Sequence, residues 1–203
     1  MIRNSKIIAT LGDATDKVLR KIVEGAADAV LIDSFYGSNE ENIERIEKIK
    51  SLREEVGRDL AIIYDVDHIY AQNKYKLIRI DEEKIYFACK NDVDFVACPF
   101  VGNLEEITKV KELIKSYGKN IGVIVKIDCK DGYENLDGIL KIADAIMINR
   151  DELGVDIPYE DLPGIQKDIV RRANEAAKVV ILTTQMLYSM VYNPRPTRAE
   201  VSD

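Results

Sequence analysis

The chain has 203 residues, of which 46% are hydrophobic and 32% are charged, and its formal net charge at neutral pH is −7. These values are typical of one well-packed globular domain and exclude a disordered chain. The net charge is negative and the sequence has no cluster of basic residues, so we expect no nucleic-acid partner. No apolar run reaches the length of a signal peptide or a membrane span, so we expect a cytoplasmic protein with no membrane partner.

Seven short apolar runs recur along the chain. They are nearly continuous in Val, Ile, Leu and Ala, which is typical of strands that are buried on both faces of a parallel sheet. The runs are KIIATLG (6–12), DAVLID (28–33), LAIIYDV (60–66), VDFVACPFV (93–101), IGVIVKI (121–127), DAIMIN (144–149) and VVILTT (179–184).

Helical patterns lie between these runs, at 40–56, 104–114 and 163–177. The first places Ile43, Ile46, Ile49, Leu52 and Val56 on one stripe, and its Glu41–Arg45 and Glu44–Lys48 pairs are expected on the exposed face. Strand–helix alternation of this kind predicts right-handed βαβ units with helices covering a parallel sheet. Seven strands are one short of a (β/α)8 barrel, and the alternation alone leaves a doubly wound sheet open.

Two stretches depart from the alternation. Residues 66–80 have no helical periodicity, and KYKLIRI (74–80) alternates like a short extra strand. The stretch NPRPTRAEVSD (193–203) predicts a turn that leads into a helix. Met186 and Met190, just before it, are expected in the core. Cys89, Cys98 and Cys129 have no metal-binding spacing, so we expect reduced, mostly buried thiols.

The carboxyl half of the chain resembles the pyruvate kinase family. The stretch KIDCKDGYENLDGILKIADAIMINRDELGVDIP (126–158) is similar to the family patterns KIEN-x-EG-x-x-N-x-DEI and DGIMVARGDLGVEIP, and TTQMLYSMVYNPRPTRAEVSD (183–203) is similar to ATQMLESM-x-x-NPRPTRAEVSD. The resemblance implies an α/β, TIM-barrel-like fold with its site at the carboxyl ends of the strands. Because the family continues beyond this stretch, we expect seven encoded strands with the eighth missing, and a single truncated barrel domain over residues 1–203.

The resemblance implies that the part of the site that binds an enolate is kept. Lys126 falls on the family's catalytic lysine, and Asp128 and Glu152 fall on its two metal-binding carboxylates with their lengths exchanged. Thr184 matches a threonine beside the substrate, and Arg150 matches an arginine that supports the site. We therefore expect a Mg²⁺ site at Asp128 and Glu152, because Mg²⁺ typically takes one or two carboxylates, with water and substrate oxygens completing its octahedron.

The same resemblance implies that the part of the site that binds the phosphoryl group is altered. Leu31 and Gln72 replace the family's two phosphate-binding arginines, and Asp33 and Phe35 replace its monovalent-cation ligands, so the K⁺ site is expected to be lost. Asp151 replaces a glycine where the substrate carboxylate approaches, and its charge would repel that carboxylate unless the side chain turns away. The family's lid domain is reduced here to the connection at 66–80.

These observations favour a pyruvate kinase-like protein that binds a small 2-oxo or enol acid with Mg²⁺ and has little kinase turnover. The alternatives are a catalytically inactive binding or regulatory module, a Mg²⁺-dependent aldolase or decarboxylase acting on a 2-oxo acid, and a minimal pyruvate kinase that another chain completes. An open barrel would leave the edge strands of its sheet unpaired. We therefore expect a homo-oligomer in which the chains associate through the open edge of the barrel.

Overall fold

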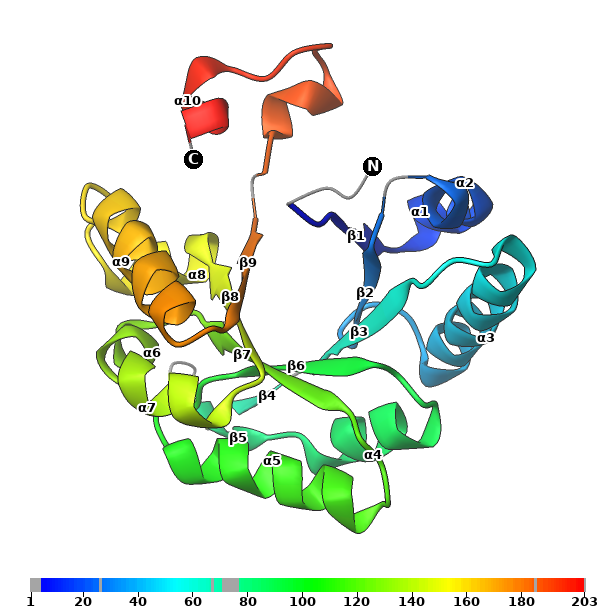
Figure 1. Ribbon diagram of the computed structural model, residues 1–203, viewed down its shortest axis with the longest axis horizontal. Coiled ribbons are helices and arrows are strands. Elements are labelled where there is room, and N and C mark those ends of the chain that lie inside the picture. The colour runs from blue at the N-terminus through cyan, green and yellow to red at the C-terminus, as the bar shows by residue number, and fades with distance from the viewer. Residues whose placement is uncertain (1–4, 26, 67, 71–76, 185, 203) are drawn as a thin grey trace.

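The computed structural model describes residues 5–25, 27–66, 68–70, 77–184 and 186–202. Its centre is a curled sheet of seven parallel strands, and the long helices lie on the outer side of the curl (Figure 1). The strands follow the order β1-β2-β3-β6-β7-β8-β9, so each pairs with the next one along the chain except across the hairpin that follows β3. They are β1 (Ile8–Leu11), β2 (Ala29–Asp33), β3 (Ala61–Asp65), β6 (Phe95–Pro99), β7 (Gly122–Ile127), β8 (Ala145–Asn149) and β9 (Val179–Thr183).

All seven predicted strands are present, which confirms the α/β barrel-type fold and rules out a doubly wound order. The extra strand predicted near residue 80 is β5 (Leu77–Ile80), which pairs antiparallel with β4 (His68–Tyr70) as a separate hairpin. The hairpin lies within the 66–80 connection. The interpretation of this connection as the remnant of a lid domain stays a prediction.

Long helices cover the outer face of the sheet. The predicted helices at 40–56, 104–114 and 163–177 correspond to α3 (Asn39–Val56), α5 (Leu104–Ser116) and α9 (Leu162–Glu175). The α3 helix begins at a capping box between Ser38 and Glu41 and ends at Gly57, whose φ of 68° suits glycine. The other helices are α1 (Asp13–Asp16), α2 (Leu19–Glu24), α4 (Glu82–Lys90), α6 (Lys130–Glu134), α7 (Leu136–Ile142), α8 (Arg150–Asp156), the 3₁₀ helix η1 (Tyr188–Val191) and α10 (Arg198–Ser202).

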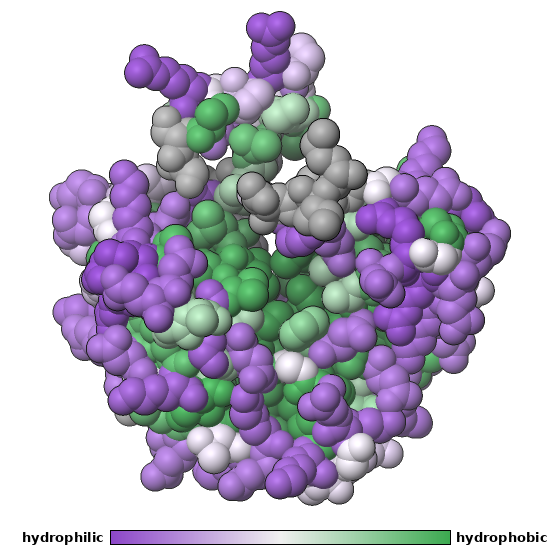
Figure 2. All heavy atoms as spheres, in the orientation of Figure 1, coloured by the Kyte–Doolittle hydropathy of each residue, from purple (hydrophilic) through white to green (hydrophobic). Residues whose placement is uncertain are grey.

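Two hydrophobic clusters lie on opposite faces of the sheet. The larger fills the space between the strands and the outer helices, and the smaller occupies the inside of the curl. Figure 2 shows apolar side chains gathered in the middle of the visible face, within a rim of hydrophilic side chains. The inner cluster consists of Ala29, Leu31, Ile63, Ala97, Ile124, Ala145 and Met147.

Two local predictions from the sequence are wrong. Arg45 is not on the exposed face of α3 but is buried, where it donates hydrogen bonds to Asp13 at 2.7 Å and to Asp16 at 3.0 Å and so ties α3 to α1. Met186 and Met190 are exposed and do not belong to the core. The thiols follow the prediction, since Cys89 and Cys98 are buried, Cys129 is half-buried, and all three are free. Among the described residues, no helix is long and apolar enough to cross a membrane.

Candidate active site

The site lies at the carboxyl ends of the strands, on the inner face of the curled sheet. Alternate residues of a strand face the same side, and the inner cluster fixes which side that is. Leu31, Ile63, Ile124 and Met147 belong to this inner cluster. The residues two positions later on the same strands therefore also face inward, near the carboxyl ends of the strands, and they are Asp33, Asp65, Lys126 and Asn149. Carboxyl ends of parallel strands meet at one edge, so these polar side chains gather there.

The Lys126 ammonium bridges two strands that are not neighbours. Its Nζ donates a hydrogen bond of 2.8 Å to Oδ1 of Asp65, and the two side chains are only 12% and 18% exposed. Strand β6 lies between β7 and β3, and its inner residues at this level are Ala97 and Pro99, which pair in register with Asp65 and Lys126. Because these two residues are small, the lysine can cross over them to the carboxylate.

The charge of Lys126 is set by its acidic neighbours. Burial alone would lower the pKa of Lys126, but the charge and hydrogen bond of Asp65, together with Asp128 and Glu152, raise it above its ordinary value. Burial raises the pKa of Asp65, and Lys126 acts against that shift. At neutral pH Lys126 is therefore a fixed positive charge and does not act as a base.

Asp128 follows β7 directly and is 6% exposed. Burial raises the pKa of its carboxyl to about 7, a shift that Lys126 opposes and Glu152 reinforces. Its Oδ1 atom is buried and has no hydrogen-bond partner. A buried carboxylate oxygen without a partner is costly, and a cation or a hydrogen-bond donor bound beside it would remove that cost.

Glu152 and Asp151 lie in the first turn of α8, and both side chains are exposed. The charge of Glu152 contributes to the upward pKa shifts of both Lys126 and Asp128, so it acts on the same charged group. Within the described ranges, no three His, Cys, Asp or Glu side chains are grouped closely enough to hold a metal ion. Two carboxylates, one of them with an unpaired buried oxygen, still fit Mg²⁺, which completes its shell with water and substrate oxygens.

Arg150 and Thr184 are brought together from α8 and the end of β9. Arg150 Nη2 donates to the carbonyl oxygen of Thr184 at 2.6 Å and contacts the sulfur of Met186 at 3.3 Å. Thr184 has a φ of 67°, an unfavourable conformation for a β-branched residue, and its hydroxyl donates to the carbonyl oxygen of Thr183. The arginine thus holds the strained backbone at the point where the chain leaves the sheet.

The residues at the altered phosphoryl positions have different surroundings. Leu31 is buried in the inner cluster, and the Asp33 carboxylate accepts a hydrogen bond from the backbone N–H of Phe35 at 2.9 Å. The Phe35 side chain is 73% exposed. Gln72 lies outside the described residues. Among the described residues, the inner face therefore presents the apolar Leu31 where the resemblance would place an arginine, and the Asp33 carboxylate where it would place a ligand of the monovalent cation.

Two polar residues of this region were not assigned from the sequence. One is Asp65 as the partner of Lys126, and the other is Asn149, whose buried Oδ1 has no partner. Both are the last residues of strands that otherwise carry apolar side chains at inner positions. A polar residue at the carboxyl end of a strand, in step with the residues that face the inside of the curl, is the signal that would have identified them.

A curled, all-parallel sheet of sequentially ordered strands with covering helices defines a domain of the (β/α) barrel type. The family model for the pyruvate kinase barrel domain matches residues 73–203, which is more than half of the chain, and the chain therefore belongs to the pyruvate kinase family. It is similar to the pyruvate kinases of Clostridium perfringens and Thermotoga maritima, with 46% identity to each, and to pyruvate kinase 1 of Saccharomyces cerevisiae, with 43% identity.

These alignments cover only part of each relative. Each includes 61% of this chain but only 26% of the two bacterial proteins and 25% of the yeast protein. The chain therefore matches about a quarter of the length of these relatives.

Proposed function

We propose that this chain binds Mg²⁺ and a small 2-oxo or enol acid at the carboxyl edge of its sheet and stabilises the enolate form of that acid. The observation that carries the proposal is the pairing of a fixed cation, Lys126, with an unpartnered buried oxygen of Asp128 on the same inner edge. A developing oxyanion is stabilised by positive charge that is already in place before the reaction begins.

Each described residue has a separate task in this proposal. The Lys126 ammonium faces the enolate oxygen, and Asp65 keeps that ammonium charged and in position. Asp128 and Glu152 are the carboxylates that would hold Mg²⁺. The metal would supply a Lewis acid that shares the negative charge of the enolate. Arg150 fixes the backbone of Thr184, whose hydroxyl could reach the substrate after turning from the Thr183 carbonyl.

Transfer of a phosphoryl group to ADP is not part of the proposed activity. A charge-assisted bond from arginine to phosphate is worth about 1.5–3 kcal/mol, so the loss of two would cost roughly 3–6 kcal/mol. Leu31 is buried among aliphatic side chains and cannot replace such a contact. The connection after β3 has too few residues to form a domain that closes over a nucleotide.

The proposal is tested by calorimetric titration of oxalate, which mimics an enolate, with and without Mg²⁺. We expect binding that requires Mg²⁺ in the wild type and is lost in Asp128→Asn, which keeps the shape of the side chain but removes its charge. Glu152→Gln should weaken binding, whereas Glu160→Gln, an equivalent change at an exposed residue beyond α8, should not. Oxalate binding that is independent of Mg²⁺, or no binding at all, would overturn the proposal.

The alternative functions separate in two further assays. Turnover of phosphoenolpyruvate and ADP in a lactate dehydrogenase-coupled assay would favour a minimal kinase and contradict the argument from Leu31. Mg²⁺-dependent exchange of the methyl protons of pyruvate with deuterium, followed by NMR, would favour enolate chemistry of the aldolase or decarboxylase type. Oxalate binding without any exchange would favour a binding or regulatory module.

A further inference from the structure

Asn149 is the last residue of β8, and its side chain faces the inside of the curl. Ala145 and Met147, two and four residues earlier on the same strand, belong to the inner cluster, while Ile146 and Ile148 belong to the outer one. The amide oxygen Oδ1 of Asn149 is buried and has no hydrogen-bond partner. A buried amide oxygen without a hydrogen-bond partner destabilises the fold, so a residue of this kind calls for an explanation.

A second unpaired oxygen lies beside it. The last register pair between β7 and β8 joins Ile127 to Ile148, and the next residue on each strand is Asp128 and Asn149. Both side chains carry a buried Oδ1 atom without a partner. The sheet therefore places two unsatisfied acceptors at adjacent positions, one from a carboxyl group and one from a neutral amide.

The nearby cation does not satisfy them. Lys126 points its Nζ across β6 to Asp65. Two neighbouring oxygens that lack a donor are suited to a hard divalent cation, whose ligands are carboxylate, amide and water oxygens. An amide oxygen adds a ligand without adding negative charge, which matters at an edge that already carries Asp33, Asp65, Asp128 and Glu152.

We infer that Asn149 is an additional oxygen ligand of the divalent cation, acting with Asp128. The inference rests on the proposed function, and it deepens that function by assigning a ligand at a position where the family pattern DGIMVARGDLGVEIP has alanine. The pair Asp128–Asn149 forms the inner side of the cation site, and the exposed Glu152 approaches from α8.

The test uses Mn²⁺ alone as the probe, measured by electron paramagnetic resonance and by calorimetry on the full chain without any substrate. Asn149→Ala should weaken Mn²⁺ binding by about 10–100-fold, the range found when a residue that supports a metal site is removed. Asn149→Asp should bind Mn²⁺ more tightly than the wild type. Asn174→Ala, an exposed asparagine at the end of α9, is the matched control and should bind as the wild type does.

Thermal unfolding separates a ligand from a structural residue. Without metal, Asn149→Ala should unfold at the same or a higher temperature than the wild type, because it removes an unpaired buried oxygen. With Mn²⁺, it should gain less in melting temperature than the wild type does. A variant that is destabilised without metal but keeps the full Mn²⁺-induced shift would overturn the inference.

The results also distinguish the two proposals. If the wild type binds no Mn²⁺, both the proposed function and the role of Asn149 fail. If binding is lost in Asp128→Asn but unchanged in Asn149→Ala, the proposed function stands and the inference about Asn149 is wrong. Weakened binding in both variants supports both.

Discussion

At the scale of single residues, the central feature is the buried pair of Lys126 and Asp65. Each charge compensates the other in a poorly hydrated place, so removal of one partner leaves an isolated charge. Breaking such a pair costs about 3–5 kcal/mol, although replacement of both partners is far milder. The pair thus supports both the stability of the sheet and the positive charge on which the proposed chemistry depends.

This argument predicts the outcome of a double-mutant cycle. Lys126→Met should lower the free energy of unfolding by about 3–5 kcal/mol, because it leaves Asp65 buried without a counter-charge. Adding Asp65→Asn to Lys126→Met should restore a large part of that loss. Urea denaturation of the wild type, both single variants and the double variant checks this. Additive effects of the two substitutions would contradict the coupling.

A second prediction concerns the pH dependence of stability at Asp128. Its pKa is about 7 in the folded chain and is taken as the ordinary 3.8 in the unfolded chain, so the folded state retains a proton that the unfolded state loses between these values. Stability from this group is therefore complete below pH 4 and falls as pH rises to 7. The loss is at most about 4 kcal/mol, at about 1.4 kcal/mol per pKa unit.

Asp128→Asn imitates the protonated carboxyl and should escape this loss. Without metal, the variant should be more stable than the wild type at pH 8 and equally stable at pH 4, as measured by urea denaturation at both pH values. Adding Mg²⁺ at pH 8 should stabilise only the wild type. A variant that is less stable than the wild type at pH 8 without metal would show that the Asp128 carboxylate is satisfied in some other way.

At the scale of elements, the stretch after β9 is organised around one carboxylate. Glu200 in α10 accepts hydrogen bonds from the backbone N–H groups of Ser189 and Thr197 and from both of their hydroxyls. These bonds lower the pKa of Glu200 to about 2. The carboxylate is therefore charged above that pH. Its hydrogen bonds join η1 to α10 in a stretch where many apolar side chains are exposed.

Glu200→Gln should loosen this junction without unfolding the sheet. We expect faster hydrogen exchange at the Ser189 and Thr197 amides, while the amides of β6 and β7 keep their protection. Because the native pKa lies below the ordinary 4.5, the stability that this carboxylate gives the junction should be complete above about pH 4.5 and should be lost progressively as pH falls toward 2. Unchanged exchange at both amides in Glu200→Gln would contradict the role given to this side chain.

The strands and long helices could be predicted from the sequence because the spacing of apolar residues reflects which side chains are buried. Arg45 escaped prediction because its partners, Asp13 and Asp16, are distant in sequence and belong to a helix of four residues. For the candidate site, the alignment with family patterns located Lys126 and Asp128. It could not give the contact with Asp65 or the burial of the Asn149 amide, since both depend on how neighbouring strands curl and stagger.

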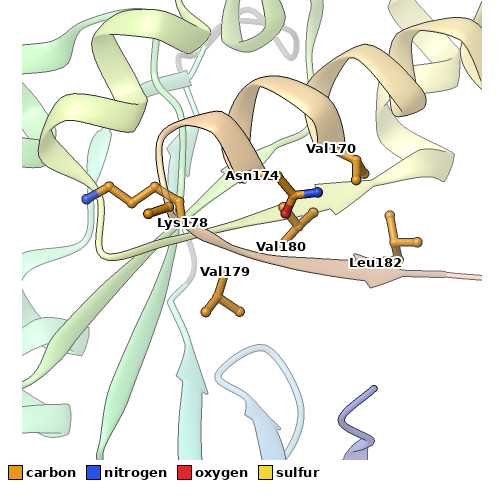
Figure 3. Close-up of a pocket in the computed structure, with 7 residues that line it drawn as sticks. Val170, Asn174, Lys178, Val179, Val180 and Leu182 are labelled. Atoms are coloured by element: carbon orange, nitrogen blue, oxygen red, sulfur yellow. The ribbon is translucent and has the colours of Figure 1, made fainter. Parts of the chain in front are cut away.

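At the scale of the whole molecule, the sheet is open, because within the described residues β1 and β9 lie at opposite edges and do not pair. An open groove of about 500 Å³ runs along β9 and α9, lined by residues that include Val170, Val179, Val180 and Leu182 (Figure 3). Val191, Tyr192 and Val201 are also exposed. Unpaired strand edges and exposed apolar surface are typical of interfaces.

We propose that a second copy of the chain covers the β9 edge. Light scattering should show a species larger than a monomer at micromolar concentration. Val179→Lys places a charge on the exposed edge and should shift the population toward the monomer, whereas Val155→Lys, at a still more exposed valine in α8, should leave it unchanged. A wild type that stays monomeric at high concentration would contradict the proposal.

The central claim is that a divalent cation and an enolate-like acid bind together beside Lys126 and Asp128. The most direct measurement is electron paramagnetic resonance of Mn²⁺ bound to the protein in the presence of oxalate labelled with ¹⁷O. The proposed site predicts broadening of the Mn²⁺ signal by the labelled oxygens in the wild type and its loss in Asp128→Asn. An unbroadened signal in the wild type would contradict the claim, since the acid would then not touch the metal.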